Sequence, residues 1–171
     1  MWTLCYISIK ALWYLWEATG QSIMVAINCT PLSLAFFTAF TGNVLHIVNV
    51  ASPTGSPIIT MPRASPSIQN QMWEFAGING PENNEGLLLP EGLSLFLSAD
   101  STSDLQHRQA TGQTLPTIFS LTNCINSTAG ALTTNDLALT AWPLDPARNF
   151  TPVTFETFTG DASQIWSFVP A

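Results

Sequence analysis

Apolar residues in this chain occur in short runs, and residues that favour turns separate one run from the next. Residues 33–40 form an apolar run, residues 41–43 (Thr-Gly-Asn) punctuate it, and residues 44–50 form the next run. Residues 153–158 alternate between apolar and polar at period two. Both patterns are typical of short β-strands joined by tight turns. Because no long amphipathic helical pattern follows residue 24, the sequence predicts an all-β fold.

The expected strands fall into three sets of four. The first set lies at residues 33–40, 44–50, 57–61 and 71–75, the second at 87–89, 93–97, 105–108 and 117–121, and the third at 129–134, 137–142, 153–158 and 164–168. A unit of four short strands cannot bury its own apolar face, so the three units are expected to share one core.

A repeated pentad closes each set of strands. Residues 71–75 (Gln-Met-Trp-Glu-Phe) and 164–168 (Gln-Ile-Trp-Ser-Phe) share a Q-x-W pattern, and residues 117–121 (Thr-Ile-Phe-Ser-Leu) are a weaker copy between them. The steps are 46 residues (71 to 117) and 47 residues (117 to 164), which predicts a threefold internal repeat. The Trp is expected to fill the shared core, and the Gln amide to hold a neighbouring turn through its backbone groups.

Composition narrows the possible partners. The chain has 171 residues, the length of one domain, and its net charge is −7, from 4 basic and 11 acidic residues. This balance argues against nucleic-acid binding and against adhesion to anionic membranes. Only 9% of the residues are charged, and there are 12 prolines and 10 glycines, which favours many short strands over a helical bundle.

Residues 1–23 differ from the rest of the chain, because they are rich in apolar and aromatic side chains. Lys10 and Glu17 interrupt this segment and argue against an integral membrane span. Without a basic start, it is also a poor signal peptide. It is either a degenerate signal, an amphipathic extension or a stretch outside the mature protein. We expect the folded domain at residues 24–171, and the localisation stays open between cytoplasmic and secreted.

The chain has three cysteines, Cys5, Cys29 and Cys124. An odd number cannot pair completely, so buried free thiols are the favoured interpretation, with a Cys29–Cys124 disulfide as the alternative. No C-x-x-C spacing occurs. We therefore expect no metal site and no cofactor.

Residues 43–62, followed by residues 70–73 (Asn-Gln-Met-Trp), resemble the repeat of the ricin B-type lectin family. In that family a strand, a Gly-containing turn and a second strand precede a loop that ends in Asn-Gln-x-Trp. The resemblance covers about residues 30–171. It implies a β-trefoil of three four-strand repeats with pseudo-threefold symmetry. It also implies a non-catalytic, carbohydrate-binding protein whose partners are neutral glycans or glycoproteins. Q-x-W is mainly a packing motif, so it supports the fold more than a sugar site.

The resemblance also implies where a sugar would bind. In these lectins an acidic residue after the second strand of a unit works with an aromatic residue on the third strand, and the Asn of Asn-Gln-x-Trp assists. No unit of this chain has the complete set, so its sugar sites would be modified. The first unit offers Asn49 and Asn70, the second offers Asp100 and His107, and the third offers Asp145 with Trp142 or Phe155. Each residue also has an ordinary structural interpretation in a loop, on the surface or in the core. We expect the third unit to be the strongest candidate.

Two other functions stand beside this one. Some trefoil proteins inhibit proteases through exposed loops, and residues 77–86 and 143–149 are the Pro- and Gly-rich segments suited to that role. Catalysis is not expected, because His46 and His107 are the only histidines and neither lies in a recognisable nucleophile–base arrangement.

Overall fold

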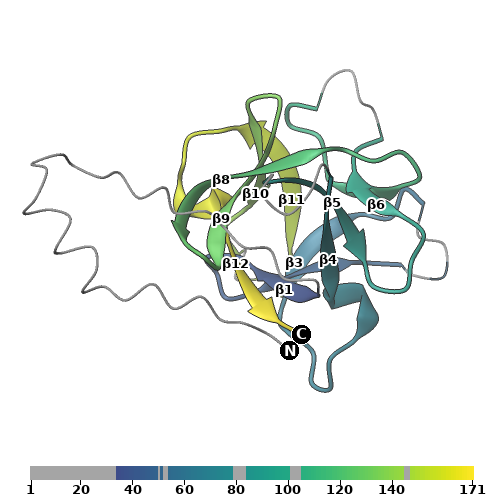
Figure 1. The fold of residues 1–171 in the computed structure, drawn as a ribbon. Helices are drawn as coiled ribbons and strands as arrows, with labels where there is room; N and C mark the ends of the chain where they lie inside the picture. Colours follow the sequence, from purple (N-terminus) through teal and green to yellow (C-terminus); the bar gives the residue numbers. More distant parts are fainter. Residues whose placement is uncertain (1–33, 50, 52–53, 79–83, 101–104, 145–146) are drawn as a thin grey trace, which may run out of the picture.

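The structure is a computed structural model of the chain. It describes residues 34–49, 51, 54–78, 84–100, 105–144 and 147–171 (Figure 1). The expectations for residues 1–23, the domain boundary at residue 24 and the candidate residue Asp145 lie outside the described residues.

Twelve β-strands and two short 3₁₀ turns make up the regular structure of the described residues, which contain no α-helix. The first unit contains β1 (Ala35–Thr38), β2 (Val44–Ile47), β3 (Ile58–Met61), the turn η1 (Gln69–Gln71) and β4 (Trp73–Gly77). The second unit contains β5 (Glu85–Pro90), β6 (Phe96–Ser98), β7 (Thr111–Gln113) and β8 (Phe119–Asn126). The third unit contains β9 (Ala129–Thr134), β10 (Leu137–Ala141), β11 (Thr151–Thr157), the turn η2 (Ala162–Gln164) and β12 (Ile165–Pro170). The prediction of an all-β chain built from three four-stranded units is confirmed.

Six of these strands close into a barrel to which each unit contributes its first and fourth strand. β1 pairs with β12, β12 with β9, β9 with β8, β8 with β5, and β5 with β4. The pairing of Ala35 with Trp73 then returns from β4 to β1 and completes the ring. Figure 1 shows β1 beside β12, so the first and last strands of the fold are neighbours. A closed ring leaves no unpaired edge among its strands.

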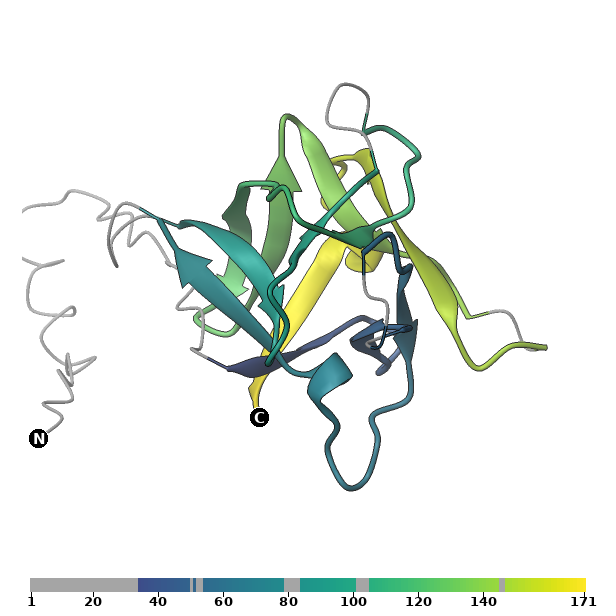
Figure 2. The ribbon, with the colours of Figure 1, turned by 90° about the vertical axis from the view of Figure 1, so that its right-hand side faces the viewer.

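The other six strands form three hairpins, one from each unit, and the hairpins contact one another. The hairpins are β2–β3, β6–β7 and β10–β11. β3 pairs with β11, and single bridges join Pro57 to Thr111 and Gln109 to Thr154. A six-stranded barrel with three hairpins related by approximate threefold symmetry is the β-trefoil fold. Figure 2 shows that residues 147–150, which lead into β11, project from this body.

One expected strand is misplaced. Residues 105–108 were expected to form the third strand of the second unit, but they form a turn, and β7 lies at Thr111–Gln113 instead. His107 has a φ of 61°, and a residue in this left-handed conformation cannot continue a strand. Because β7 contains Thr, Gly and Gln and no large apolar residue, the hydrophobic pattern carries no signal for it.

The Q-x-W tryptophans occupy equivalent positions in the core. Trp73 and Trp166 are both fully buried. Trp73 Nε1 donates to the Leu45 carbonyl oxygen at 3.0 Å, and Trp166 Nε1 donates to the Leu139 carbonyl oxygen at 2.9 Å. Each indole therefore fills the core. Its N–H is a buried donor that needs a partner, and the bond it makes links the last strand of the unit to the second strand.

The Q-x-W glutamines hold the loop that precedes each motif through hydrogen bonds to the loop backbone. Gln71 accepts from the backbone N–H of Ala64 at 2.8 Å and donates to the Pro62 carbonyl at 2.9 Å. Gln164 accepts from the N–H of Thr159 at 2.8 Å and donates to the Thr157 carbonyl at 2.8 Å. Backbone groups in a loop have no partners in a strand ladder, and the two amides supply hydrogen-bond partners for them instead. The predicted packing role of the motif is confirmed.

The second unit departs from this pattern. Thr117 stands at the glutamine position, and its hydroxyl pairs with the hydroxyl of Ser98 at 2.7 Å. Phe119 replaces the tryptophan, is fully buried and stacks on Phe155 with ring centroids 6.1 Å apart. No 3₁₀ turn precedes β8 in the described residues.

Cys124 lies on β8, is partly buried against the core and is disulfide-bonded. The interpretation of this residue as a free thiol is therefore wrong. The other two cysteines of the sequence, Cys5 and Cys29, lie outside the described residues. The odd number of cysteines misled the sequence analysis, because an odd count still allows one bridge.

Candidate functional site

The two candidate residues of the first unit make separate contacts. Asn49 is exposed, and its Oδ1 accepts from the backbone N–H of Ala51 at 3.2 Å, which makes a local turn. Asn70 lies in η1, and its Nδ2 donates to the Ile47 carbonyl at 3.2 Å. The same Nδ2 lies 3.3 Å from Nε2 of His46. Asn70 therefore meets His46 on β2.

His46 is nearly buried, at 7% exposure, and this burial lowers the pKa of its imidazole below the ordinary value of 6.5. Desolvation disfavours the charged form of the ring. A neutral ring can accept from Asn70 at Nε2 and carry its proton on Nδ1. Nδ1 has no hydrogen-bond partner among the described residues. His46 and Asn70 thus form a small polar pair at the edge of an apolar strand.

The two candidate residues of the second unit also have different partners. Asp100 is exposed and lies 3.6 Å from Nη1 of Arg108 in a solvent-facing ion pair. His107 is exposed as well, but its Nδ1 lies 2.5 Å from Oε2 of Glu156, a residue of the third unit. The second unit therefore contributes its histidine to a group of residues centred on β11.

The two aromatic candidates of the third unit are in different environments. Phe155 is fully buried and stacks on Phe119, so its ring is part of the core and does not face a ligand. Trp142 directly follows β10 and is 44% exposed. Its Nε1 donates to the hydroxyl of Thr154 at 2.8 Å, which holds the indole at the surface.

Four side chains connect into one hydrogen-bonded group, which we call the Trp142 cluster: Trp142, Thr154, Glu156 and His107. The Trp142 N–H donates to Thr154, and the Thr154 hydroxyl donates to Oε1 of Glu156 at 2.6 Å. Oε2 of Glu156 contacts the His107 ring. The cluster joins Trp142 and His107, which the sequence analysis had assigned to different units.

The backbone explains why these residues meet. Thr154 and Glu156 are two positions apart on β11, so both point to the face opposite the buried Val153 and Phe155. The His107 N–H donates to the Phe155 carbonyl at 2.7 Å, which fixes the turn against this strand. The positive φ of His107 directs the chain around that turn.

The arrangement leaves specific groups for a ligand. The side chain of Glu156 is 13% exposed and is held by two partners, so its carboxylate is fixed in one orientation. The side chain of His107 is 73% exposed. An exposed indole, a fixed carboxylate and an exposed imidazole can contact the apolar face and the hydroxyl groups of one small molecule.

Sequence reasoning did not select Thr154 or Glu156. A signal for them was present in the period-two alternation of residues 153–158, which places both on the outward face of a strand. The connection to His107 depends on a contact between strands of different units, and no local pattern reports such a contact.

The described residues contain no group of His, Cys, Asp or Glu side chains suited to hold a metal ion. They also contain no helix with the length and apolar character that crossing a bilayer requires.

The barrel and its hairpins place this chain among the β-trefoil proteins, and solved structures agree. A designed threefold symmetric protein, ThreeFoil, superposes with a TM-score of 0.68 at 15% identity, over 82% of this chain and 100% of that chain. A ricin B-like lectin of Macrolepiota procera, solved with lactose, gives a TM-score of 0.65 at 16% identity, over 86% of this chain and 100% of the lectin. The Rhizoctonia solani agglutinin gives 0.64 at 16% identity, over 88% and 100%.

No protein-family model matches the chain, and no curated protein matches it. The fold is a β-trefoil of the kind found in ricin B-like lectins. Because the identities are low, the likeness establishes the fold and leaves the ligand to be argued from the site.

Proposed function

We propose that this protein is a non-catalytic, carbohydrate-binding β-trefoil, and that the Trp142 cluster is its principal sugar site. The observation that carries the proposal is an exposed indole held beside a fixed carboxylate. The trefoil lectin neighbours, one of them solved with lactose, support the class of function.

The chemistry of the cluster suits a pyranose ring. One face of many sugars is lined by C–H groups, and an indole offers a flat apolar surface for it. The carboxylate of Glu156 has lone pairs left to accept hydroxyl protons, and charge-assisted hydrogen bonds of this kind are stronger than neutral ones. Since both partners of Glu156 are intramolecular, the site is organised before a ligand arrives.

Charge favours neutral glycans over acidic ones. The net charge of the chain is −7, and Glu156 lies within the cluster. An anionic sugar would meet repulsion from both. The proposed partners are therefore neutral glycans or glycoproteins.

The remaining candidates are proposed as secondary contacts. Asn70 with His46 forms a polar pair in the first unit, and Asn49 and Asp100 are exposed. Asp145 comes three residues after Trp142 in the sequence. None of these positions reproduces the full acidic–aromatic–amide set, so we propose modified sites with lower affinity than the Trp142 cluster.

The absence of catalysis is part of the proposal. Among the described residues, the recorded side-chain partner of His46 is Asn70 and that of His107 is Glu156. Neither imidazole contacts a Ser or Cys that it could activate as a nucleophile.

The first experiment is a glycan array with the full chain at several concentrations. A specific hit on neutral glycans supports the proposal, and Trp142→Ala should then weaken it strongly while Phe40→Ala does not. Phe40 is a matched control because it is also an exposed aromatic residue, at 48% exposure, in the β1–β2 turn. A folded protein that binds no glycan would refute the proposed function.

The described residues between β10 and β11 support a second candidate function, protease inhibition. Leu144 and Phe150 are 44% and 43% exposed, and Figure 2 shows residues 147–150 extending from the body. An inhibitory loop presents such side chains to the substrate cleft of a protease. Tight inhibition of a papain-like or serine protease that Leu144→Asp removes would support this function, and the glycan array tests the two independently.

A further inference from the structure

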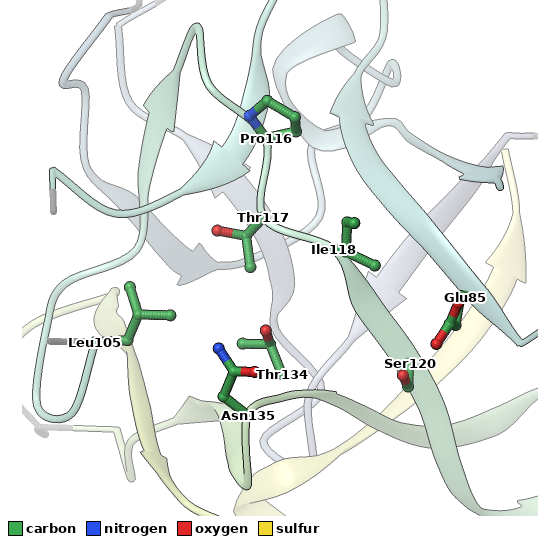
Figure 3. Close-up of a pocket in the computed structure, with 8 residues that line it drawn as sticks. All are labelled: Glu85, Leu105, Pro116, Thr117, Ile118, Ser120, Thr134 and Asn135. Carbon is green, nitrogen blue, oxygen red and sulfur yellow. The ribbon is translucent and has the colours of Figure 1, made fainter. Parts of the chain in front are cut away.

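A hollow of about 380 Å³ lies between the second and third units (Figure 3). Its walls come from β5, from the segment that leads into β8, and from the turn between β9 and β10. The volume falls in the range of small-molecule sites. None of its lining residues belongs to the Trp142 cluster.

The hollow occurs where the threefold repeat is incomplete. In the first unit, η1 covers the equivalent junction: a Cβ added to Gly92 would lie 3.4 Å from Nε2 of Gln69. The second unit has no such turn before β8, and at the repeat spacing of 46 residues Leu115 and Thr117 stand where the first unit has Gln69 and Gln71. The hydroxyl of Thr117 is taken by Ser98 at 2.7 Å, so no long amide fills this junction.

Four polar side chains surround the hollow: Glu85, Ser120, Thr134 and Asn135. Among the described residues, none of these side chains makes a hydrogen bond or ion pair. Glu85 and Ser120 are paired positions on adjacent strands, so their side chains share one face. Asn135 has a φ of 46° and Asp136 a φ of 63°, the signature of a tight two-residue hairpin turn that holds the amide at the rim.

The hollow is also lined by apolar side chains. Leu105, Pro116 and Ile118 line it, and Ile118 is 51% exposed. Figure 3 shows Glu85 and Ser120 on one side and Leu105 on the other, with Thr134 and Asn135 near the base. A ligand would therefore need a hydroxylated, positively charged side and a small apolar face.

We propose that this hollow binds an amino sugar through its free ammonium group. Glu85 is the only charged side chain among the described lining residues. Its carboxylate would pair with the ammonium, while Ser120, Thr134 and Asn135 would bond the neighbouring hydroxyls. The net charge of −7 draws a cation toward the surface and repels an anion. The inference stands apart from the proposed glycan site, since the two share no residue.

The test is an NMR titration of the full chain with D-glucosamine, at about pH 6, where a primary amine carries its proton. Glucose and N-acetylglucosamine serve as uncharged probes of the same ring. We expect glucosamine to shift the backbone amide signals of Ser120, Thr134 and Asn135, and the uncharged sugars to shift them much less.

Substitutions of lining residues test whether glucosamine binds in this hollow. Glu85→Gln should weaken glucosamine binding about tenfold, because it removes a charge-assisted contact. Glu74→Gln is the matched control, since Glu74 is an exposed residue on the adjacent strand β4 and makes the same change of charge. Asn135→Gly should also weaken binding, and glycine keeps the positive φ of that turn.

Three outcomes would overturn the inference. Glucosamine could fail to shift these signals, or it could bind Glu85→Gln and Glu74→Gln equally well. Finally, Trp142→Ala could abolish glucosamine binding while Glu85→Gln retains it, which would place the amine at the Trp142 cluster. A blank glycan array with retained glucosamine binding would refute the proposed function alone.

Discussion

At the scale of single residues, Trp142 is held at the surface by one hydrogen bond. Its indole N–H donates to Thr154, and Thr154 in turn donates to Glu156. A surface tryptophan that is oriented in this way loses little further freedom when a ligand packs on it. We therefore expect the indole ring and the hydrogen bond that orients it to make separate contributions to the affinity for a ligand.

This separation can be tested with two substitutions at one position. Trp142→Ala removes the ring and should weaken glycan binding about tenfold or more. Trp142→Phe keeps an aromatic face but loses the bond to Thr154, so its affinity should fall between those of the alanine variant and the native protein. Isothermal titration with an array-positive glycan measures both. Equal affinity of all three proteins would contradict the assignment.

His46 makes stability depend on pH. Burial lowers the pKa of the folded-state imidazole below 6.5, whereas the unfolded chain binds a proton as the pH falls through that value. The unfolded state then holds more protons, so the free energy of unfolding decreases as the pH falls below 6.5.

His46→Gln should reduce that part of the pH dependence, because glutamine has no charge to gain and can still accept from Asn70. Urea unfolding at about pH 7.5 and about pH 5.5 brackets the histidine titration. The loss of stability between the two should be smaller in the variant. Parallel losses in both proteins would show that His46 is not responsible.

At the scale of elements, the glutamines of the Q-x-W motif link a strand to the loop before it. Gln164 is 3% exposed and bonds the backbone of Thr157, Thr159 and Gly160. It also reaches the hydroxyl of Thr140 on β10. Among the described residues, Gln71 has fewer partners, the backbone groups of Ala64 and Pro62. The third unit should therefore depend on its glutamine more strongly than the first.

Gln164→Ala should lower the free energy of unfolding by about 1–3 kcal/mol, because buried backbone groups lose their partners. Gln71→Ala should cost less. Gln106→Ala is the control, since Gln106 is exposed and bonds a side chain, Thr157, at 3.2 Å. Urea unfolding of the three variants would rank them, and an equal cost for Gln164→Ala and Gln106→Ala would contradict the structural role.

The same motif also shows how an element can be lost without loss of the fold. In the second unit Thr117 and Phe119 keep the core filled, while the 3₁₀ turn is missing. The Thr117–Ser98 bond satisfies both buried hydroxyls. The core thus tolerates this change, and its visible consequence is the hollow beside Thr117.

At the scale of the whole molecule, the six-stranded ring brings together residues that are distant along the chain. Phe37 on β1 packs on Phe168 on β12, with centroids 5.1 Å apart. Such contacts cannot form until the first and last units meet. Constraints that reduce the freedom of the unfolded chain are therefore expected to matter for stability.

The disulfide of Cys124 is one such constraint. Cys124→Ser should lower the stability of the full chain by about 2–4 kcal/mol, mainly because the unfolded chain gains freedom. A reductant should lower the melting temperature of the native protein, and it should not affect the variant. A native protein whose melting temperature is the same with and without reductant would refute the prediction.

Much of the architecture was predictable because it depends on local patterns. Short apolar runs and the Q-x-W spacing predicted twelve strands and a threefold repeat, and both are present. β7 was placed too early, because Thr111–Gln113 carries no large apolar side chain. Its position follows instead from pairing with Phe96–Ser98 on β6.

The candidate site was predictable only in part. Trp142 and His107 were selected from the sequence as residues of two separate sites, and the structure joins them through Glu156. Phe155 was selected as well, but its position on the inward face of β11 places it in the core. Period two shows which residues of a strand share a face, but it does not show which face is inward.

By itself, the sequence determined the class of fold, the number of units and the packing role of the Q-x-W residues, because strand periodicity and repeat spacing are properties of neighbouring residues. Only the tertiary structure decided that His107 meets Glu156, that Cys124 is bridged and that a hollow opens beside Thr117. The contact of His107 with Glu156 and the hollow both depend on how separate units pack, and the closure of the ring sets that packing.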